Sequence, residues 1–208
     1  MAKVKICGIT TLEDALLAAE LGADMIGFNF YPGSKRYVSA ERVASFVESL
    51  NESVTKIGVF VNASVDDILF AKKLALLDGV QLHGSESSKF ITGLRERVET
   101  KIIKAIQIRS VSDISSLGDF GADAVLMDSY SASDFGGTGE TFDWQIAQEG
   151  REKVDQLFLA GGLTPENVAE AIRIVRPYAV DVASGVESSP GKKDPKKMEA
   201  FVKNAKNA

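Results

Sequence analysis

The chain has 208 residues, of which 45% are hydrophobic and 25% are charged, and its formal net charge is −5. This composition is typical of a globular protein with a full core, and it excludes a disordered chain. The acidic balance argues against a nucleic-acid surface, and a single cysteine rules out an intrachain disulfide.

The sequence shows neither a signal-peptide pattern after Met1 nor a long apolar run without charges. We therefore expect a cytoplasmic protein that does not enter a membrane. The lone cysteine fits a reducing compartment. Because no linker or low-complexity tract interrupts the chain, we expect one domain covering residues 1–208.

Short runs rich in β-branched residues alternate with amphipathic stretches along the chain. The predicted strands cover residues 4–7, 25–30, 56–61, 80–83, 102–106, 124–128, 157–160 and 179–183. The predicted helices lie near 11–21, 40–50, 65–77, 86–98, 111–117, 143–149, 165–175 and 194–205. Helix-capping side chains stand at several of the starts, namely Thr11, Ser39, Ser64 and Thr164. Gly22 follows the first helix as a C-terminal glycine.

This succession of strand–helix units, with no hairpin signal between strands, predicts an α/β fold, a single (β/α)₈ TIM barrel. A doubly wound open sheet is the alternative, because it is built from the same units and strand count does not separate the two. In both folds the carboxyl ends of the strands carry the chemistry. The lysines near the C-terminus are interpreted as a solvated helix face: Lys192, Lys193, Lys196 and Lys197.

Glycine-rich loops follow the last three predicted strands. In chain order they contain Gly137, Thr138, Gly139, Gly161, Gly162, Ser184 and Gly185. Glycine lets backbone N–H groups approach an anion closely, and a following helix N-terminus adds its dipole. In barrels, the loops after the seventh and eighth strands frequently bind phosphate. The sequence therefore predicts a phosphate site.

Two residues that can exchange protons end predicted strands. Cys7 ends the first strand and Asp128 the sixth, so both side chains are expected at the mouth of the barrel. A carboxyl at the edge of an apolar strand is a candidate general acid, although a carboxylate bound to loop N–H groups is an equal alternative. A lone cysteine is more often a buried core residue than a reactive one.

Further polar residues are expected at the same mouth. Alternation places Gln81 and His83 on one face of the fourth strand, where they would line a pocket or satisfy buried polar groups. Asp181 lies near the end of the eighth strand. Arg36, in the loop after the second strand, is either a surface charge or a bidentate partner for a carboxylate.

The sequence does not predict a metal or a cofactor. One cysteine and one histidine argue against zinc. A magnesium site from Asp128, Asp181 and Glu187 would compete with acid–base work. The glycines at 136–139 lack the spacing of a dinucleotide fingerprint, and no P-loop lysine follows them.

Motifs distributed over the whole chain carry a family resemblance. They are KICGIT at 5–10, SKRYV at 34–38, GVFVN at 58–62, VQLHG at 80–84, GGTG at 136–139, FDW at 142–144, AGGL at 160–163 and DVASGVE at 181–187, followed by PG at 190–191 and KD at 193–194. The chain resembles the phosphoribosylanthranilate isomerases. It departs from them at Ala183, where the family usually has serine.

The resemblance implies an intramolecular oxidoreductase of the aldose–ketose type that acts in tryptophan biosynthesis without a cofactor. It would convert N-(5-phosphoribosyl)anthranilate to 1-(2-carboxyphenylamino)-1-deoxyribulose 5-phosphate by an Amadori rearrangement. Carried over by motif, Cys7 is the general base, Asp128 is the general acid and Arg36 binds the anthranilate carboxylate. The partner is thus a small phosphorylated molecule, and the chain is expected to be a monomer or a homodimer.

A thiol base raises a difficulty, because a free thiol is mostly protonated at neutral pH. Lys5 lies on the same strand face as Cys7, roughly 6–7 Å along it. Its ammonium either stabilises the thiolate or pairs with a carboxylate deeper in the barrel.

Two other functions stay open at this stage. A histidine-pathway aldose–ketose isomerase would share the barrel and the phosphate site, but it usually uses two aspartates, and Cys7 stands in the place of the first. A non-catalytic sensor of phosphorylated ligands would tolerate Cys7→Ser and Asp128→Asn.

Overall fold

The structure is a computed structural model that describes residues 1–108, 111–129 and 144–208. Its barrel strands β1–β8 are Lys3–Cys7, Met25–Asn29, Thr55–Phe60, Gly79–Leu82, Lys101–Ile108, Ala124–Ser129, Leu157–Leu159 and Ala179–Val182. The α-helices α1–α7 are Leu12–Glu20, Ala40–Ala44, Val65–Leu74, Ser88–Arg97, Trp144–Arg151, Val168–Val175 and Pro195–Lys206. Shorter elements are the 3₁₀ helices η1 (Val47–Ser49), η2 (Val111–Phe120) and η3 (Ser184–Val186), and the strands β9 (Glu187–Ser189) and β10 (Lys192–Lys193).

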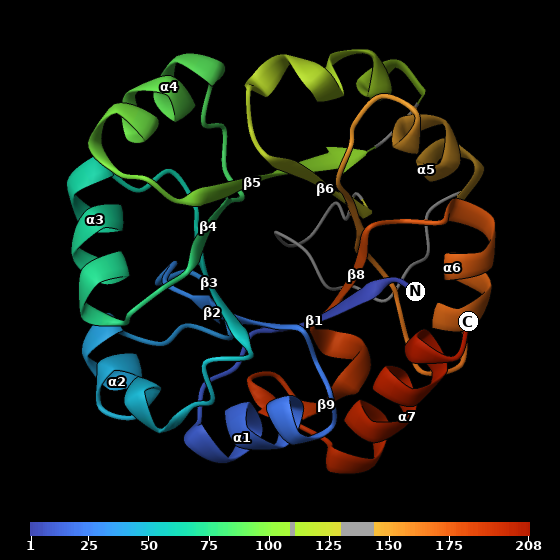
Figure 1. Cartoon of the computed structure of the whole chain (residues 1–208), viewed down its shortest axis with the longest axis horizontal. Helices are drawn as coiled ribbons and strands as arrows, with labels where there is room; N and C mark the ends of the chain where they lie inside the picture. Colours follow the sequence, from blue (N-terminus) through green and yellow to red (C-terminus); the bar gives the residue numbers. More distant parts are fainter. Residues whose placement is uncertain (109–110, 130–143) are drawn as a thin grey trace.

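Strands β1 to β8 form a closed barrel in which each strand pairs with its neighbour in the sequence. All the pairs are parallel, including the closing pair between β8 and β1. Figure 1 looks along the barrel, with the helices in a ring around it. The predicted TIM barrel is therefore confirmed, and the open sheet is excluded by the pairing of β8 with β1.

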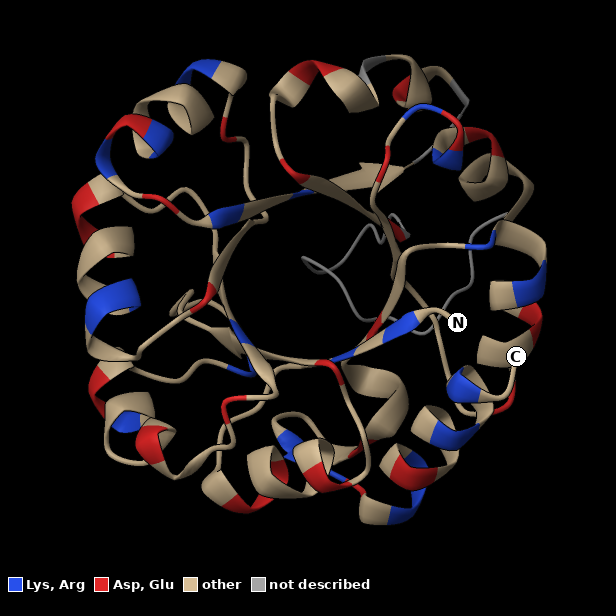
Figure 2. Cartoon of the chain, in the orientation of Figure 1, with Lys and Arg blue, Asp and Glu red and all other residues tan. Residues whose placement is uncertain are grey.

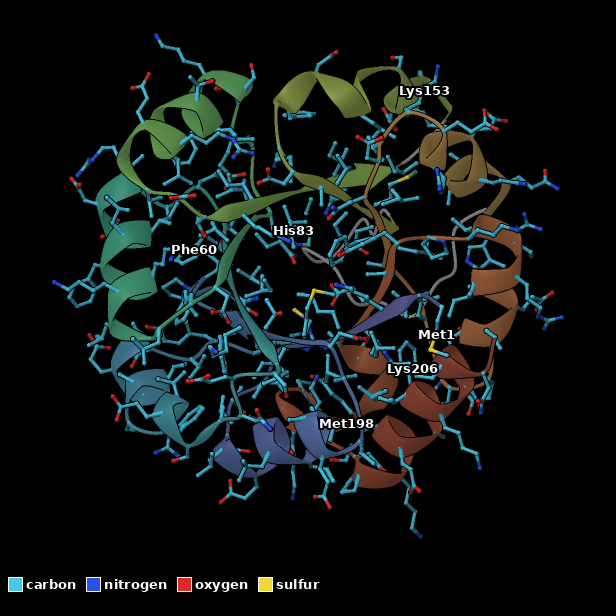
Figure 3. All side chains as sticks on the ribbon, viewed as in Figure 1. Met1, Phe60, His83, Lys153, Met198 and Lys206 are labelled. Atoms are coloured by element: carbon cyan, nitrogen blue, oxygen red, sulfur yellow. The ribbon has the colours of Figure 1, made fainter. Side chains whose placement is uncertain are left out.

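Alternation along each strand divides the side chains between two layers. Val4 and Ile6 of β1 are fully buried in the layer between barrel and helices, whereas Lys5 and Cys7 face the barrel interior. Figure 3 shows the same division, with Phe60 outside the barrel wall and His83 on its inner side. Each buried large apolar side chain contributes about 1.5–3 kcal/mol to folding.

The barrel interior is apolar over most of its length and polar at one end. Its apolar part consists of Met25, Ile57, Ile103, Ala105, Ala124, Leu126, Phe158, Ala160 and Ala179. At the carboxyl ends of the strands, the side chains that face the interior are mostly polar. Figure 2 shows that acidic and basic residues on the outside are distributed around the whole ring of helices.

Most of the predicted helix signals hold. Thr11, Ser39 and Ser64 each accept a hydrogen bond from a backbone N–H in the first turn of their helix. Gly22 follows α1 with a φ of 92°, which glycine adopts without strain. Thr164 does not cap a helix, because the chain first forms a loop and α6 begins only at Val168.

Two predicted helices differ from the structure. The stretch near 40–50 is divided into α2 and η1, since Ser45 donates its hydroxyl to the carbonyl of Arg42 and competes with helix continuation. The stretch near 111–117 is the 3₁₀ helix η2, within which Ser115 bonds in the same way to Ser112. Local side-chain bonds of this kind weaken an α-helix.

A short antiparallel hairpin, β9–β10, follows η3, although the sequence showed no hairpin signal. Its turn includes Gly191, whose φ is 79°. The hairpin also corrects the interpretation of the C-terminal lysines. Lys193 is only 2% exposed, because it points inward from β10, whereas Lys192 beside it is exposed.

A buried ion pair fixes the loop after β4. Glu86 accepts hydrogen bonds from the N–H groups of Asn62 and Gly84, at 2.8 and 2.9 Å, and from Lys104 Nζ at 2.9 Å. Lys104, on the outer face of β5, also donates to the carbonyl of Gly84 at 2.6 Å. The pair therefore holds the carboxyl end of β4, which presents His83.

We expect this ion pair to make folding sensitive to acid. Burial alone raises the pKa of Glu86, but hydrogen bonds from Lys104 and Asn62 outweigh burial, so the pKa lies below its ordinary value of 4.5. The resulting stability is present above that ordinary value and is lost as the pH falls through the lower, folded-state pKa. Urea unfolding from pH 7 to pH 3 should show a smaller loss of stability in Glu86→Gln than in wild type. Glu96→Gln, at an exposed site on α4, is the control; identical profiles for Glu86→Gln and wild type would contradict the prediction.

Candidate active site

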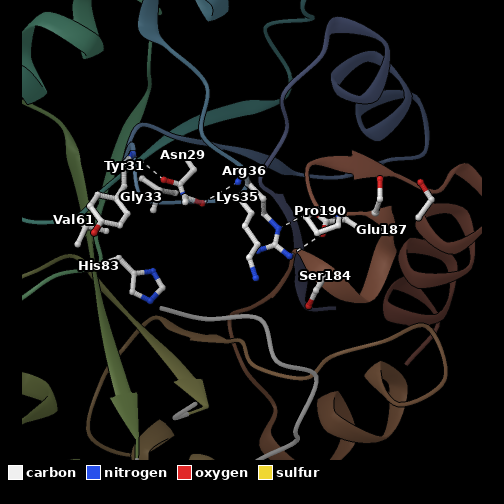
Figure 4. A pocket seen from close by; sticks show the side chains of 14 residues that line it. Asn29, Tyr31, Gly33, Lys35, Arg36, Val61, His83, Ser184, Glu187 and Pro190 are labelled. Carbon is white, nitrogen blue, oxygen red and sulfur yellow. Dashed lines mark hydrogen bonds and ion pairs between the residues drawn. The ribbon is translucent and has the colours of Figure 1, made fainter. Parts of the chain in front are cut away.

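A cavity opens at the carboxyl ends of β2, β3, β4 and β8. Its volume is about 340 Å³, and Tyr31, Arg36, His83, Ser184 and Glu187 are among the residues that line it (Figure 4). A narrower space of about 80 Å³ continues into the top of the barrel. Because both spaces are lined by Arg36, His83 and Ser184, they form one continuous site.

The narrower space brings together most of the residues predicted from the sequence. They are Cys7, Arg36, Gln81, His83, Asp128, Gly161, Gly162, Asp181 and Ser184. Cys7 and Asp128 therefore open onto one cavity from opposite parts of the sequence. Gly137, Thr138 and Gly139 lie outside the described residues.

Lys5 lies directly beneath Cys7 and is fully buried. Its ammonium pairs with Asp181 at 3.0 Å. It also lies near the thiol across Gly27: a Cβ at residue 27 would be 2.8 Å from Cys7 Sγ and 3.0 Å from Lys5 Nζ. The position of Lys5 is thus compatible both with stabilising the thiolate of Cys7 and with pairing to a carboxylate. Glycine at position 27 leaves room for the sulfur of Cys7 and the ammonium of Lys5.

The electrostatic environment of Cys7 contains opposing contributions. Burial raises the pKa of the thiol and is the largest effect; the Lys5 ammonium lowers the pKa, and the Asp181 carboxylate raises it again. The net result is a pKa above the ordinary value. For Lys5, burial lowers the pKa, but Asp181 and Cys7 together raise it by more than burial lowers it. The pKa of Lys5 therefore lies above its ordinary value, and the ammonium form is favoured.

Asp128, at the end of β6, lies opposite His83. The distance between His83 Nε2 and Asp128 Oδ2 is 3.5 Å. On the other side of the ring, Gln81 Nε2 lies 3.3 Å from His83 Nδ1. Asp128 is 5% exposed and Gln81 is 1% exposed, so both are held in a nearly dry environment.

Arg36 is held in the cavity wall by a bidentate ion pair. Its Nε and Nη2 donate to the two carboxylate oxygens of Glu187, each at 2.8 Å (Figure 4). Burial raises the pKa of Glu187, but Arg36 and Lys193 lower it by more, which keeps the carboxylate ionised. Arg36 is therefore a positioned group of the site and not a surface charge.

Lys193 supports this ion pair from behind. Its ammonium donates to Glu187 Oε1 at 3.0 Å, to the carbonyl of Cys7 at 2.6 Å and to the carbonyl of Ala183 at 3.1 Å. An ammonium has three donors, and all three find an acceptor here. This role of Lys193 was not predicted from the sequence, where the available signal was a Glu and a Lys on either side of a Pro-Gly turn.

The glycine loops after β7 and β8 lie against each other. Gly161 and Gly162 have positive φ values of 84° and 63°, which glycine adopts without strain. A Cβ at Gly185 would be 1.9 Å from the carbonyl oxygen of Leu163, so only glycine permits this approach. Asn167 fixes the first loop by donating to the carbonyl of Gly162 at 2.9 Å.

The described residues contain neither a metal-binding cluster nor a membrane-spanning helix. Among them, no group of three or more His, Cys, Asp and Glu side chains could hold a metal ion. Within the same part of the chain, every helix is too short or too polar to cross a membrane.

Comparison with known proteins agrees with the geometry. Residues 4–204 match the family described as N-(5'phosphoribosyl)anthranilate (PRA) isomerase. The N-(5'-phosphoribosyl)anthranilate isomerase of Trichlorobacter lovleyi is 46% identical over 208 residues, covering 100% of both chains. The crystal structure of phosphoribosyl anthranilate isomerase from Thermotoga maritima is 44% identical, with a TM-score of 0.92 and full coverage of both chains. A further structure of such an enzyme, in complex with reduced 1-(o-carboxyphenylamino)-1-deoxyribulose 5-phosphate, has a TM-score of 0.89, 42% identity and full coverage of both chains.

Proposed function

The chain belongs to the N-(5'-phosphoribosyl)anthranilate isomerase family, whose reaction is a step of tryptophan biosynthesis, and we propose that Cys7 and Asp128 carry that reaction here. The single observation that supports this assignment most strongly is their position on one cavity, with Arg36 in the same wall. A base, an acid and a carboxylate-binding group are the three parts that the chemistry needs.

The two ends of the substrate have matching groups in this proposal. Arg36 binds the anthranilate carboxylate, for which a planar guanidinium is well suited. The loops at Gly161, Gly162, Ser184 and Gly185 bind the phosphate through backbone N–H groups, together with Gly137, Thr138 and Gly139. The relative's ligand, a carboxyphenylamino deoxyribulose 5-phosphate, supports the proposal because it carries both kinds of group. Ala183 removes one hydroxyl but leaves these N–H donors.

The reaction opens the ribose ring first. Asp128 gives its proton to the ring oxygen while the amine lone pair forms an iminium and the C1–O bond breaks. The iminium acidifies the hydrogen on C2, and the thiolate of Cys7 removes it to give a neutral enolamine. Each positioned acid or base typically contributes about 10²–10⁴-fold in rate.

The second half restores both groups. Cys7 returns its proton to C1, and the Asp128 carboxylate accepts the proton of the C2 hydroxyl as the ketone forms. C2 is thereby oxidised and C1 is reduced within one molecule. Because the electrons stay in the substrate, the rearrangement needs no external electron carrier, which is our reason for proposing a cofactor-independent Amadori reaction.

Turnover of freshly prepared phosphoribosylanthranilate, followed by its fluorescence, tests the proposal. The wild-type chain should consume the substrate with saturable kinetics. Absence of turnover in a folded preparation would overturn the proposed function.

We expect Lys5 to assist the thiolate. In Lys5→Met, burial and Asp181 both raise the pKa of Cys7 without opposition from the ammonium. The pH profile of thiol alkylation should move to higher pH, and alkylation at neutral pH should slow. Lys3→Met is the control, because Lys3 lies on the same strand but at 5.2 Å from the ring of Tyr178, at the other end of the barrel. If Lys5→Met fails to fold because it leaves the Asp181 carboxylate without its ammonium, the double variant Lys5→Met/Asp181→Asn removes both charges together. An unchanged alkylation profile in a folded Lys5→Met variant would contradict the expected role of Lys5.

A further inference from the structure

Two buried polar atoms at the end of β4 lack partners. Among the described side chains, the buried nitrogen and oxygen atoms without a hydrogen bond are Gln81 Oε1, His83 Nε2 and Trp144 Nε1. Gln81 and His83 are two residues apart and line the same narrow space as Cys7 and Asp128. Leaving a buried polar atom unpaired is unfavourable, so two such atoms inside one site indicate a role in binding a ligand.

The contact between the two side chains decides where the ring carries its proton. The amide nitrogen of Gln81 lies 3.3 Å from His83 Nδ1. With the amide nitrogen of Gln81, which is only a donor, turned to the ring, Nδ1 is the acceptor and the neutral ring carries its proton on Nε2. Gln81 is 1% exposed, so its amide is held away from bulk solvent.

The protonated nitrogen faces Asp128. His83 Nε2 is 3.5 Å from Asp128 Oδ2, which is longer than a formed hydrogen bond. Catalytic hydrogen bonds are often long without ligand and shorten when the substrate is bound. With its nitrogen turned to the ring, Gln81 also leaves Oε1 in the site, where a hydroxyl of the pentose would satisfy it.

We propose that Gln81 is a positioning residue that fixes His83 as the Nε2–H tautomer and directs that proton at Asp128. This inference rests on the proposed role of Asp128 as the general acid. When Asp128 has given its proton to the ring oxygen, His83 donates a hydrogen bond to the carboxylate that remains. The proton of His83 is not transferred, so the proton balance of the reaction is unchanged.

His83 is the only histidine in the chain, so ¹⁵N NMR of the labelled imidazole reads this one ring. In wild type, Nε2 should carry the proton and Nδ1 should not. Gln81→Glu places an acceptor beside Nδ1, and the two nitrogen signals should exchange character. The kcat of this variant should fall about 10- to 100-fold, with a smaller change in KM, because the acid itself is retained.

Gln156→Glu is the matched control, since it adds the same charge directly before β7, at the opposite end of the barrel. If Gln81→Glu fails to fold, Gln81→Met removes the amide without adding charge, and its ring should populate both tautomers. Three results would each overturn the proposal. The first is a wild-type ring protonated on Nδ1, and the second is a pure Nε2–H ring in either variant. The third is an exchanged tautomer with unchanged kcat. The NMR result does not depend on turnover, so it is distinguishable from failure of the proposed function.

Discussion

Asp128→Asn and Cys7→Ser should each reduce kcat by about 10²–10⁴-fold, the contribution of one positioned acid or base. Asparagine retains the size of the side chain at Asp128 but cannot give a proton to the ring oxygen. Serine retains the position at Cys7, but its hydroxyl is a far weaker acid than a thiol and does not form the base. Steady-state turnover of phosphoribosylanthranilate measures both effects.

The phosphate loops should be intact in these variants. Binding of inorganic phosphate, measured by calorimetry, should remain close to the wild-type affinity because neither side chain belongs to the loops. Asp155→Asn, at an exposed position two residues before β7, controls for loss of one carboxylate. Turnover retained in both site variants would show that Cys7 and Asp128 do not carry the reaction.

Lys193→Met should both destabilise the protein and raise KM. Removing one partner of a buried ion pair costs about 3–5 kcal/mol, and we expect the lower end because Arg36 still pairs with Glu187. The carbonyls of Cys7 and Ala183 also lose a donor. With Glu187 no longer held from behind, Arg36 is less firmly placed for the substrate carboxylate. Urea unfolding gives the stability, and the split between KM and kcat gives the effect on binding.

The neighbouring lysine supplies a control for this change. Lys192→Met removes the same charge from the same hairpin, but at an exposed position, so its stability and KM should stay near wild type. If Lys193→Met also kept the stability and KM of wild type, the proposed support of Glu187 by Lys193 would be contradicted. Glu187→Gln should share the rise in KM, since it weakens the same support of Arg36.

The barrel could be predicted because its pattern is local. Val4 and Ile6 alternate with Lys5 and Cys7, and the same period of two recurs in each strand, so the sequence distinguishes the outer layer from the interior. Helix starts at Thr11, Ser39 and Ser64 follow from hydrogen bonds within one turn.

For residues on distant segments, the sequence predicts that they lie at the same end of the barrel but not which atoms are in contact. That Cys7 and Asp128 share a mouth follows from their places at strand ends, but the distance between His83 and Asp128 does not. Their strands, β4 and β6, are separated by β5, and neighbouring strands are about 4.7–4.9 Å apart, so the side-chain rotamers decide whether the two groups meet. The burial of Lys193 was not predicted for a related reason: lysine is rarely buried without a partner, and its partners lie on β1, on β9 and directly after β8.

The hydrogen bond from Lys193 to the carbonyl of Cys7 joins two segments that lie 186 residues apart in the sequence. During translation, β1 with Cys7 therefore leaves the ribosome long before Lys193 has been added to the chain. Until residue 193 has emerged, the nascent chain holds the proposed base without the lysine that anchors its backbone. Competence for the reaction should thus arise only after residue 193 has left the ribosome.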